Sequence, residues 1–238
     1  MLRLILCLLL LAAPARAADL PDAPPLHPSA GFVPAGPARA RGVLVWLHGS
    51  PDPADPRPPG EPDWVGRMAA RGLDIWRFDR PRGQDALAPG GEALARGVAA
   101  LRAGGYRRVI VAGHSRGAWI ALSILAHPGL ADAVVAISPA AFGTRPERQA
   151  EARQAWAAMW QGAERARTRV VLVQLADDPY DPDPAQRRAV AVAESHRAGL
   201  PCLSLFHPPA PVGHIGVYDP NFDTRLGARL AAFADPPR

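Results

Sequence analysis

The chain has 238 residues, of which 48% are hydrophobic, so it is long and apolar enough for one domain with a sizeable core. Its 27 basic residues are all arginine and outnumber the 22 acidic residues, which gives a net charge of +5. We exclude a nucleic-acid-binding class, because the arginines are spread among acidic residues and no nucleic-acid-binding motif accompanies them. We also expect no cofactor and no metal, since no phosphate-binding loop, dinucleotide motif or metal-ligand spacing is present.

The first 17 residues have the features of a secretory signal peptide. Arg3 supplies a positive start, and Leu4 to Ala13 is an apolar run too short to span a bilayer comfortably. Ala15-Arg16-Ala17 then matches an A-x-A cleavage site. We expect an exported protein, periplasmic or secreted, whose mature chain is not stably inserted in a membrane. Cys202 is the one cysteine after this segment, so the mature protein would have no internal disulfide.

Residues 18–41 are rich in proline and alanine and predict an extended lead-in, with a short edge strand at residues 31–33. Residues 42–238 predict a single domain. Buried strands are expected at residues 42–47, 73–78, 109–112, 133–137, 169–175 and 201–206. Helices are expected at residues 63–70, 91–103, after Ser115, and at 146–167, 184–198 and 223–233.

Strands that alternate with helices along the whole domain predict an α/β fold with a mostly parallel central sheet covered by helices on both faces. Ligand sites in such sheets form at the carboxyl ends of the strands. Chemically useful residues should therefore follow the strands directly.

The strand at 109–112 leads into Gly113-His114-Ser115-Arg116-Gly117, which fits G-x-S-x-G. The chain must reverse from strand to helix here, which strains the serine backbone and leaves room only for glycine on either side. The strained turn lifts the Ser115 hydroxyl clear of the sheet, and the free N–H groups of the following helix face it. This setting is typical of a nucleophile elbow.

Other polar residues also follow predicted strands. His48 and Gly49 follow the first central strand, and Asp178 follows the strand at 169–175, while His214 lies in a glycine-rich loop after the last strand. With Ser115, these residues give the order Ser, Asp, His. The chain therefore resembles the α/β-hydrolase superfamily from about residue 42 to 235, and is similar to small dienelactone-hydrolase-like serine esterases with reduced edge strands.

The resemblance implies roles that the chemistry also requires. Ser115 would be the nucleophile, His214 the general base, and a carboxylate would hold the imidazole in the correct tautomer. The oxyanion would be bound by the backbone N–H of Arg116 and by that of Ser50 or Gly49. His48 and His114 belong to these motifs, and we expect them to orient loops rather than transfer protons.

Several assignments stay open. Asp178 is the preferred acid, Asp181 is the second candidate with a solvated role as its default, and Asp177 is the third. Asp183 is interpreted as a helix cap, and His207 is the alternative to His214. Two tryptophans one helical turn apart, Trp156 and Trp160, either pack in the core or roof the pocket.

These features predict an exported serine hydrolase that cleaves a small-molecule carboxylic ester, with a short acyl chain, through an acyl-enzyme. A serine peptidase acting on short peptides is one alternative. The other is a non-catalytic binding protein that keeps only the hydrolase fold.

Overall fold

The computed structural model describes residues 26–50, 60–80, 86–163 and 167–237. The predicted signal peptide, residues 18–25 of the lead-in and residues 51–59 lie outside these described residues.

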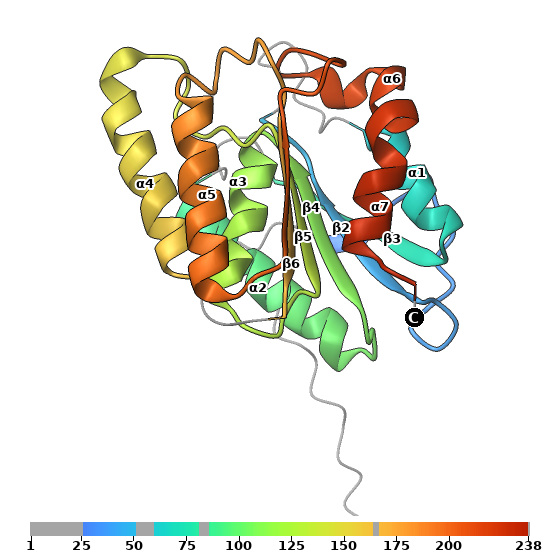
Figure 1. Cartoon of the computed structure of the whole chain (residues 1–238). Coiled ribbons are helices and arrows are strands. Elements are labelled where there is room, and N and C mark those ends of the chain that lie inside the picture. The colour runs from blue at the N-terminus through green and yellow to red at the C-terminus, as the bar shows by residue number, and fades with distance from the viewer. Residues whose placement is uncertain (1–25, 51–59, 81–85, 164–166, 238) are drawn as a thin grey trace, which may run out of the picture.

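The described strands form one sheet in the order β1-β3-β2-β4-β5-β6-β7 (Figure 1). Their bounds are β1 Leu26–Pro28, β2 Gly42–Leu47, β3 Leu73–Phe78, β4 Val109–His114, β5 Ala133–Ile137, β6 Arg169–Gln174 and β7 Cys202–Phe206. β1 pairs with β3 in the antiparallel sense, and every other pairing is parallel. The predicted mostly parallel sheet is therefore confirmed.

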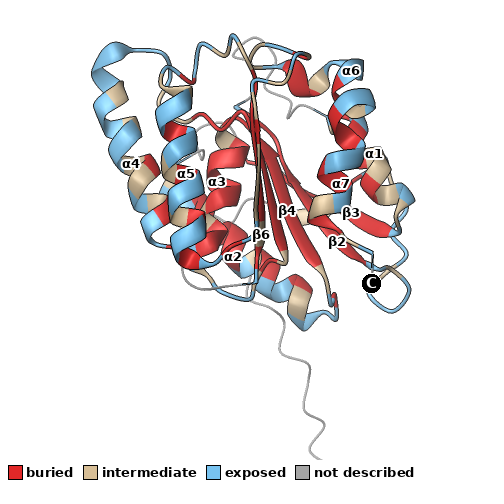
Figure 2. Ribbon diagram, in the orientation of Figure 1, coloured by how far each residue is buried: buried red, intermediate tan, exposed pale blue. Residues whose placement is uncertain are grey.

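The central strands form because they are continuous apolar runs that can be buried on both faces. All residues of β2, β4 and β5 are buried, and Figure 2 shows these strands as the buried centre of the molecule. Two apolar cores result, one on each side of the sheet.

Helices cover both faces of the sheet (Figure 1). The helices α2 (Leu87–Ala103), α3 (Arg116–Ser123), α4 (Gln149–Gln161) and α5 (Pro184–Ala198) lie on one side. On the other side lie α1 (Asp63–Ala70), α6 (Pro220–Phe222), the π-helical turn η4 (Asp223–Gly227) and α7 (Ala228–Ala234). Single 3-10 turns occur at η1 (Ile124–Ala126), η2 (Pro146–Arg148) and η3 (Gly216–Tyr218). No helix within the described ranges has the length and apolar character needed to cross a bilayer.

The edge of the sheet differs from the sequence prediction. The expected strand at residues 31–33 is wrong: Val33 is almost fully exposed, and the edge strand is instead β1, whose Leu26 pairs with Phe78 of β3. Pro28 ends this strand, in keeping with the preference of proline for sheet edges. The sheet thus begins inside the segment that was expected to be an extended lead-in.

Two helix boundaries also differ. α2 begins at Leu87 rather than residue 91, because Pro89 falls in the first turn, where its missing N–H costs nothing. Gly90 and Gly91 continue the helix because α3 packs against them: a Cβ on Gly90 would lie 3.1 Å from the Ile120 side chain. The helix predicted at 146–167 is a 3-10 turn followed by α4, which ends at Gln161 before Gly162.

The strand register brings the chemically useful residues to one edge. Leu47 of β2 lies opposite Gly113 of β4, and His114 lies opposite Ile137 of β5. The carboxyl ends of these strands are therefore level with one another. β2 lies between β3 and β4, so the chain passes from β2 to β3 on one side and then crosses to β4 on the other. Ligand sites in open α/β sheets form at such a switch point, outside the carboxyl ends of the strands.

Candidate active site

Ser115 lies in the sharp turn between β4 and α3, as the G-x-S-x-G motif predicts. Its backbone has φ 55° and ψ −122°, a conformation that an L-residue adopts only under strain. A Cβ on Gly113 would lie 2.5 Å from the Gly117 backbone, and one on Gly117 would overlap the carbonyl oxygens of Leu47 and His48. Close backbone contacts therefore require both glycines and hold the turn in place.

Three side chains from distant segments form a hydrogen-bonded chain at this turn. His214 Nε2 lies 2.8 Å from Ser115 Oγ. On the other side of the ring, His214 Nδ1 lies 2.9 Å from Asp178 Oδ2 and 3.0 Å from Oδ1. The Asp178 and His214 side chains are only 3% and 13% exposed. The imidazole thus has a carboxylate on one nitrogen and a hydroxyl on the other.

The loop after β6 brings one of the candidate aspartates to the histidine. Asp177 has a positive φ of 58° and is exposed, and this turn directs the next residue, Asp178, to His214. Asp181 is buried, which contradicts the expected solvated role. Its carboxylate accepts hydrogen bonds from Arg187 Nη1 and Gln174 Nε2, both at 2.8 Å. Its negative charge is therefore used in a buried ion pair.

Asp183 stands at the N-cap position of α5, but the predicted side-chain cap is wrong. Its carboxylate accepts no capping hydrogen bond and instead pairs with Arg153 Nη1 of α4 at 2.8 Å. The favourable interaction with α4 replaces the cap, and Pro184 at the first helical position removes one N–H that a cap would have satisfied.

A cavity of about 10 Å³ lies between this ion pair and the elbow helix. It is lined by, among others, Trp119, Phe142, Ala152, Arg153 and Tyr180. The Tyr180 ring, which lines this cavity, stands 4.4 Å from the His214 ring.

The two tryptophans of α4 are core residues. Trp156 and Trp160 are 1% and 0% exposed, and Trp156 packs against Trp119 with a centroid distance of 5.3 Å. The Trp156 indole N–H donates to the Arg187 carbonyl. Core packing is thus the correct alternative for both, and α4 reaches the cavity through its first turns instead.

His114, the second residue of the motif, orients the loop that carries His214. The ring stands 4.9 Å from that of His214, and its Nε2 donates to the His214 carbonyl oxygen at 2.8 Å. Desolvation by burial, followed by the neighbouring His214, lowers the pKa of His114 to about 4. The ring is therefore neutral near pH 7 and keeps this donor role.

The loop after β2 passes directly beside the nucleophile. A Cβ on Gly49 would lie 3.2 Å from the Ser115 Cβ. Ser50 follows, and its Oγ accepts a hydrogen bond from Arg116 Nε at 3.2 Å. Both candidate oxyanion donors, the N–H groups of Ser50 and Arg116, thus belong to residues that adjoin the elbow.

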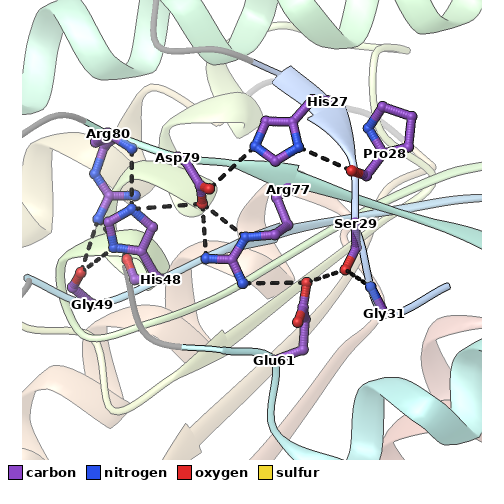
Figure 3. Close-up of polar contacts among 10 residues, drawn as sticks. All are labelled: His27, Pro28, Ser29, Gly31, His48, Gly49, Glu61, Arg77, Asp79 and Arg80. Atoms are coloured by element: carbon purple, nitrogen blue, oxygen red, sulfur yellow. Dashed lines mark hydrogen bonds and ion pairs between the residues drawn. The ribbon is translucent and has the colours of Figure 1, made fainter. Parts of the chain in front are cut away.

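Two residues, His48 and Arg80, contact this loop through hydrogen bonds. Arg80 is a residue that the sequence analysis did not identify. His48 Nδ1 donates to the Gly49 carbonyl at 2.5 Å, and its Nε2 accepts the Arg80 backbone N–H at 3.0 Å (Figure 3). Arg80 follows β3, a strand beside β2, and this position at the carboxyl edge of the sheet was the signal that could have identified it. Burial, then the Arg80 charge, lowers the pKa of His48 to about 4, so it too is neutral.

The remaining histidine alternative lies apart from this arrangement. His207 has a positive φ of 45° and stacks on Phe206, whereas the hydrogen bonds to serine and aspartate are made by His214. Within the part of the chain that the structure describes, no group of three or more His, Cys, Asp or Glu side chains could hold a metal ion.

Comparisons with solved structures find the same fold at low sequence identity. The esterase Pf2001 of Pyrococcus furiosus is 15% identical with a TM-score of 0.54, over 82% of this chain and 84% of that one. A thermophilic esterase of Thermogutta terrifontis is 16% identical with a TM-score of 0.57, over 90% of each chain. A puromycin-hydrolyzing peptidase of Mycobacterium tuberculosis is 16% identical with a TM-score of 0.60, over 87% of this chain and 37% of that one.

No protein-family model matches the chain, and a comparison with curated protein sequences finds no match. The structural likenesses confirm the fold class that the sequence predicts.

Proposed function

We propose that this chain, which has the α/β-hydrolase fold, is an exported serine hydrolase that cleaves a small-molecule carboxylic ester through an acyl-enzyme. Ser115 is the nucleophile, His214 the general base and acid, and Asp178 the carboxylate that orients the imidazole. The observation that carries the proposal is the hydrogen-bonded chain from Ser115 through His214 to Asp178, with distances of 2.8 and 2.9 Å.

The geometry supports a two-step reaction. His214 Nε2 takes the proton from Ser115 Oγ as that oxygen attacks the ester carbonyl carbon. The oxyanion that forms accepts hydrogen bonds from the backbone N–H groups of Arg116 and Ser50. The bond to the alcohol oxygen then breaks, and His214 returns its proton to that oxygen.

Water releases the acyl group in the second step. His214 removes a proton from a water molecule that attacks the acyl carbonyl, and Ser115 leaves with that proton. Asp178 carries the negative charge that stabilises the imidazolium in both steps, and its buried position strengthens this interaction.

A short acyl chain is expected because little of the chain could cover the triad. The helix α4 (Gln149–Gln161), between β5 and β6, is too short to close over a long acyl chain. The cavity lined by Trp119, Arg153 and Asp183 holds about 10 Å³, close to the space of one water molecule, so it has no room for a long acyl chain either. We therefore expect p-nitrophenyl acetate and butyrate to be cleaved faster than the long-chain esters, with no activation at a lipid interface.

The structural likenesses include two esterases and a peptidase, so both ester and peptide hydrolysis are assayed. A panel of short esters and short peptides, assayed with one enzyme preparation, distinguishes the two reactions.

The decisive experiment is labelling of the purified protein with a fluorophosphonate, followed by peptide mapping. Modification of Ser115, together with loss of labelling and ester hydrolysis in Ser115→Ala, supports the proposal. Ser138→Ala is a matched control, because Ser138 is also buried, has a positive φ of 45° and follows a central strand. A wild-type protein that takes no label would instead favour a non-catalytic binding protein.

Export is tested on the mature chain. N-terminal sequencing of protein from the periplasm or medium should begin at Ala18, and protein that stays in the cytoplasm with its first 17 residues intact would contradict the proposal.

A further inference from the structure

Arg80 is a buried arginine to which the mechanism above gives no role. It is only 1% exposed and follows β3 closely, at the edge of the sheet where Ser115 lies. A charged side chain is rarely buried to this degree unless its donors are used. The partners of Arg80 therefore indicate what it does.

Arg80 donates to the loop that adjoins the nucleophile. Its Nη2 lies 2.5 Å from the His48 carbonyl oxygen and 3.3 Å from the Gly49 carbonyl oxygen, and its backbone N–H donates to His48 Nε2 (Figure 3). His48 Nδ1 donates to the same Gly49 carbonyl. Two consecutive carbonyl groups are thus held by one guanidinium and one imidazole.

The direction of these carbonyls decides where the next N–H points. Among described residues the one cis peptide bond is Ala210–Pro211, so the bond from Gly49 to Ser50 is trans. In a trans peptide the N–H is opposite to the C=O across a rigid plane. Because the Gly49 carbonyl points to Arg80 and His48, the Ser50 N–H points away from them. Ser115 lies beside this peptide, as the 3.2 Å approach to its Cβ shows.

We propose that Arg80 and His48 are positioning residues for the oxyanion site, which lock the Gly49–Ser50 peptide so that the Ser50 N–H faces the developing oxyanion. This inference rests on the proposed function. A preorganised donor stabilises the transition state because it does not have to reorient as charge develops. A lysine at position 80 would be a poor substitute, because its ammonium is a point charge on a flexible stem, whereas the rigid guanidinium fixes the direction in which Nη2 donates to both carbonyls.

His48 must be neutral to play this part, because it donates through Nδ1 while it accepts through Nε2. Asp79 is the carboxylate that faces it, 4.0 Å from Nε2, and Arg77 Nε and His27 Nε2 hold the Asp79 carboxylate at 2.9 and 3.1 Å. These contacts connect the Asp79 carboxylate to β3 and β1, as Figure 3 shows.

The test compares Arg80→Lys with Arg77→Lys. Both remove a guanidinium from the same polar cluster, but Arg77 pairs with the carboxylates of Glu61 and Asp79, whereas Arg80 holds the loop carbonyls. Three quantities are measured: kcat per fluorophosphonate-labelled site and KM with p-nitrophenyl acetate, and Ki for a trifluoromethyl ketone. The ketone adds Ser115 Oγ to its carbonyl carbon, and the resulting oxyanion needs the same donors as the transition state.

For Arg80→Lys we expect kcat per labelled site to fall about 10- to 100-fold with KM nearly unchanged, because a misaligned donor costs up to about that factor. Ki for the ketone should rise by the same factor. Arg77→Lys should leave all three values close to wild type even if its melting temperature falls. Wild-type kcat per site and Ki in Arg80→Lys would overturn the inference.

Two further variants, His48→Asn and His48→Gln, keep the inference testable if Arg80→Lys does not fold. The shorter asparagine amide keeps a donor near the Nδ1 position, whereas the longer glutamine amide keeps only an acceptor near Nε2. His48→Gln should therefore lose more kcat than His48→Asn, and equal activity in the two variants would contradict the role of the Gly49 carbonyl contact. A wild-type protein that neither cleaves the ester nor takes the label overturns the proposed function itself, which is a separate result.

Discussion

Acid should destabilise this protein well above the pH at which carboxylates are protonated, because two of its histidines are buried in neutral form. His48 is 0% and His114 is 4% exposed, and the pKa of each is lowered from 6.5 to about 4, mainly by desolvation. Between pH 6.5 and about pH 4, these two histidines bind protons in the unfolded chain but not in the folded one. Stability therefore falls as the pH falls from about 6.5 towards 4.

The magnitude follows from the two pKa values. For a histidine whose pKa shifts from 6.5 to about 4, the free energy of unfolding falls by roughly 2 to 3 kcal/mol between pH 7 and pH 4.5, so the two histidines together give on the order of 5 kcal/mol. Such a loss is a large part of the roughly 5–15 kcal/mol that typically stabilises a domain. Burial raises the pKa of Asp79, but the Arg77 hydrogen bond and charge outweigh burial and lower it below 3.8. Asp79 therefore stays ionised between pH 7 and pH 4.5 and does not contribute to this loss of stability.

Urea unfolding at pH 7.0, 5.5 and 4.5, followed by tryptophan fluorescence, measures the effect. The free energy of unfolding should decline steadily over this series. His48→Asn and His114→Gln should each remove about half of the decline, since neither replacement titrates in this range. A wild-type free energy that is the same at pH 7.0 and 4.5, or a decline that both variants retain in full, would refute the reasoning.

Four sets of substitutions test the site and its supports. Ser115→Gly should be inactive yet more stable than Ser115→Ala by about 1 kcal/mol in urea unfolding, because glycine relieves the φ of 55°. Asp178→Asn should lower kcat by orders of magnitude with little change in stability, while Asp177→Asn, at an exposed position, keeps near wild-type kcat, and loss of activity in the latter alone would reassign the acid. Asp181→Asn should instead cost about 3 kcal/mol of stability in urea unfolding, because it leaves a buried arginine without its carboxylate. Gly117→Ala should fail to fold by circular dichroism, because its Cβ would overlap two backbone carbonyls at the end of β2.

Local pattern was sufficient for much of this protein. The strand at 73–78, the helix at 63–70 and the strand at 133–137 have the predicted bounds, because a short apolar or aromatic-rich run or an amphipathic period specifies one element with little help from neighbours. The turn at Ser115 is also a local property, since two glycines and a serine at fixed spacing admit one strand-to-helix reversal. The order Ser, Asp, His and the alternation of elements then predicted the fold.

The tertiary structure decided what depends on contact between distant segments. Four aspartates follow β6 within a few residues, and only the path of the folded loop shows that Asp178 reaches His214 while Asp181 binds Arg187. The same holds for Arg80, whose partner His48 in the loop after β2 is 32 residues away in the chain. Hydrophobic periodicity records which face of an element is buried, but a polar side chain can satisfy its hydrogen bonds with many partners. Which partner it meets is fixed only when the sheet brings the carboxyl ends of its strands together.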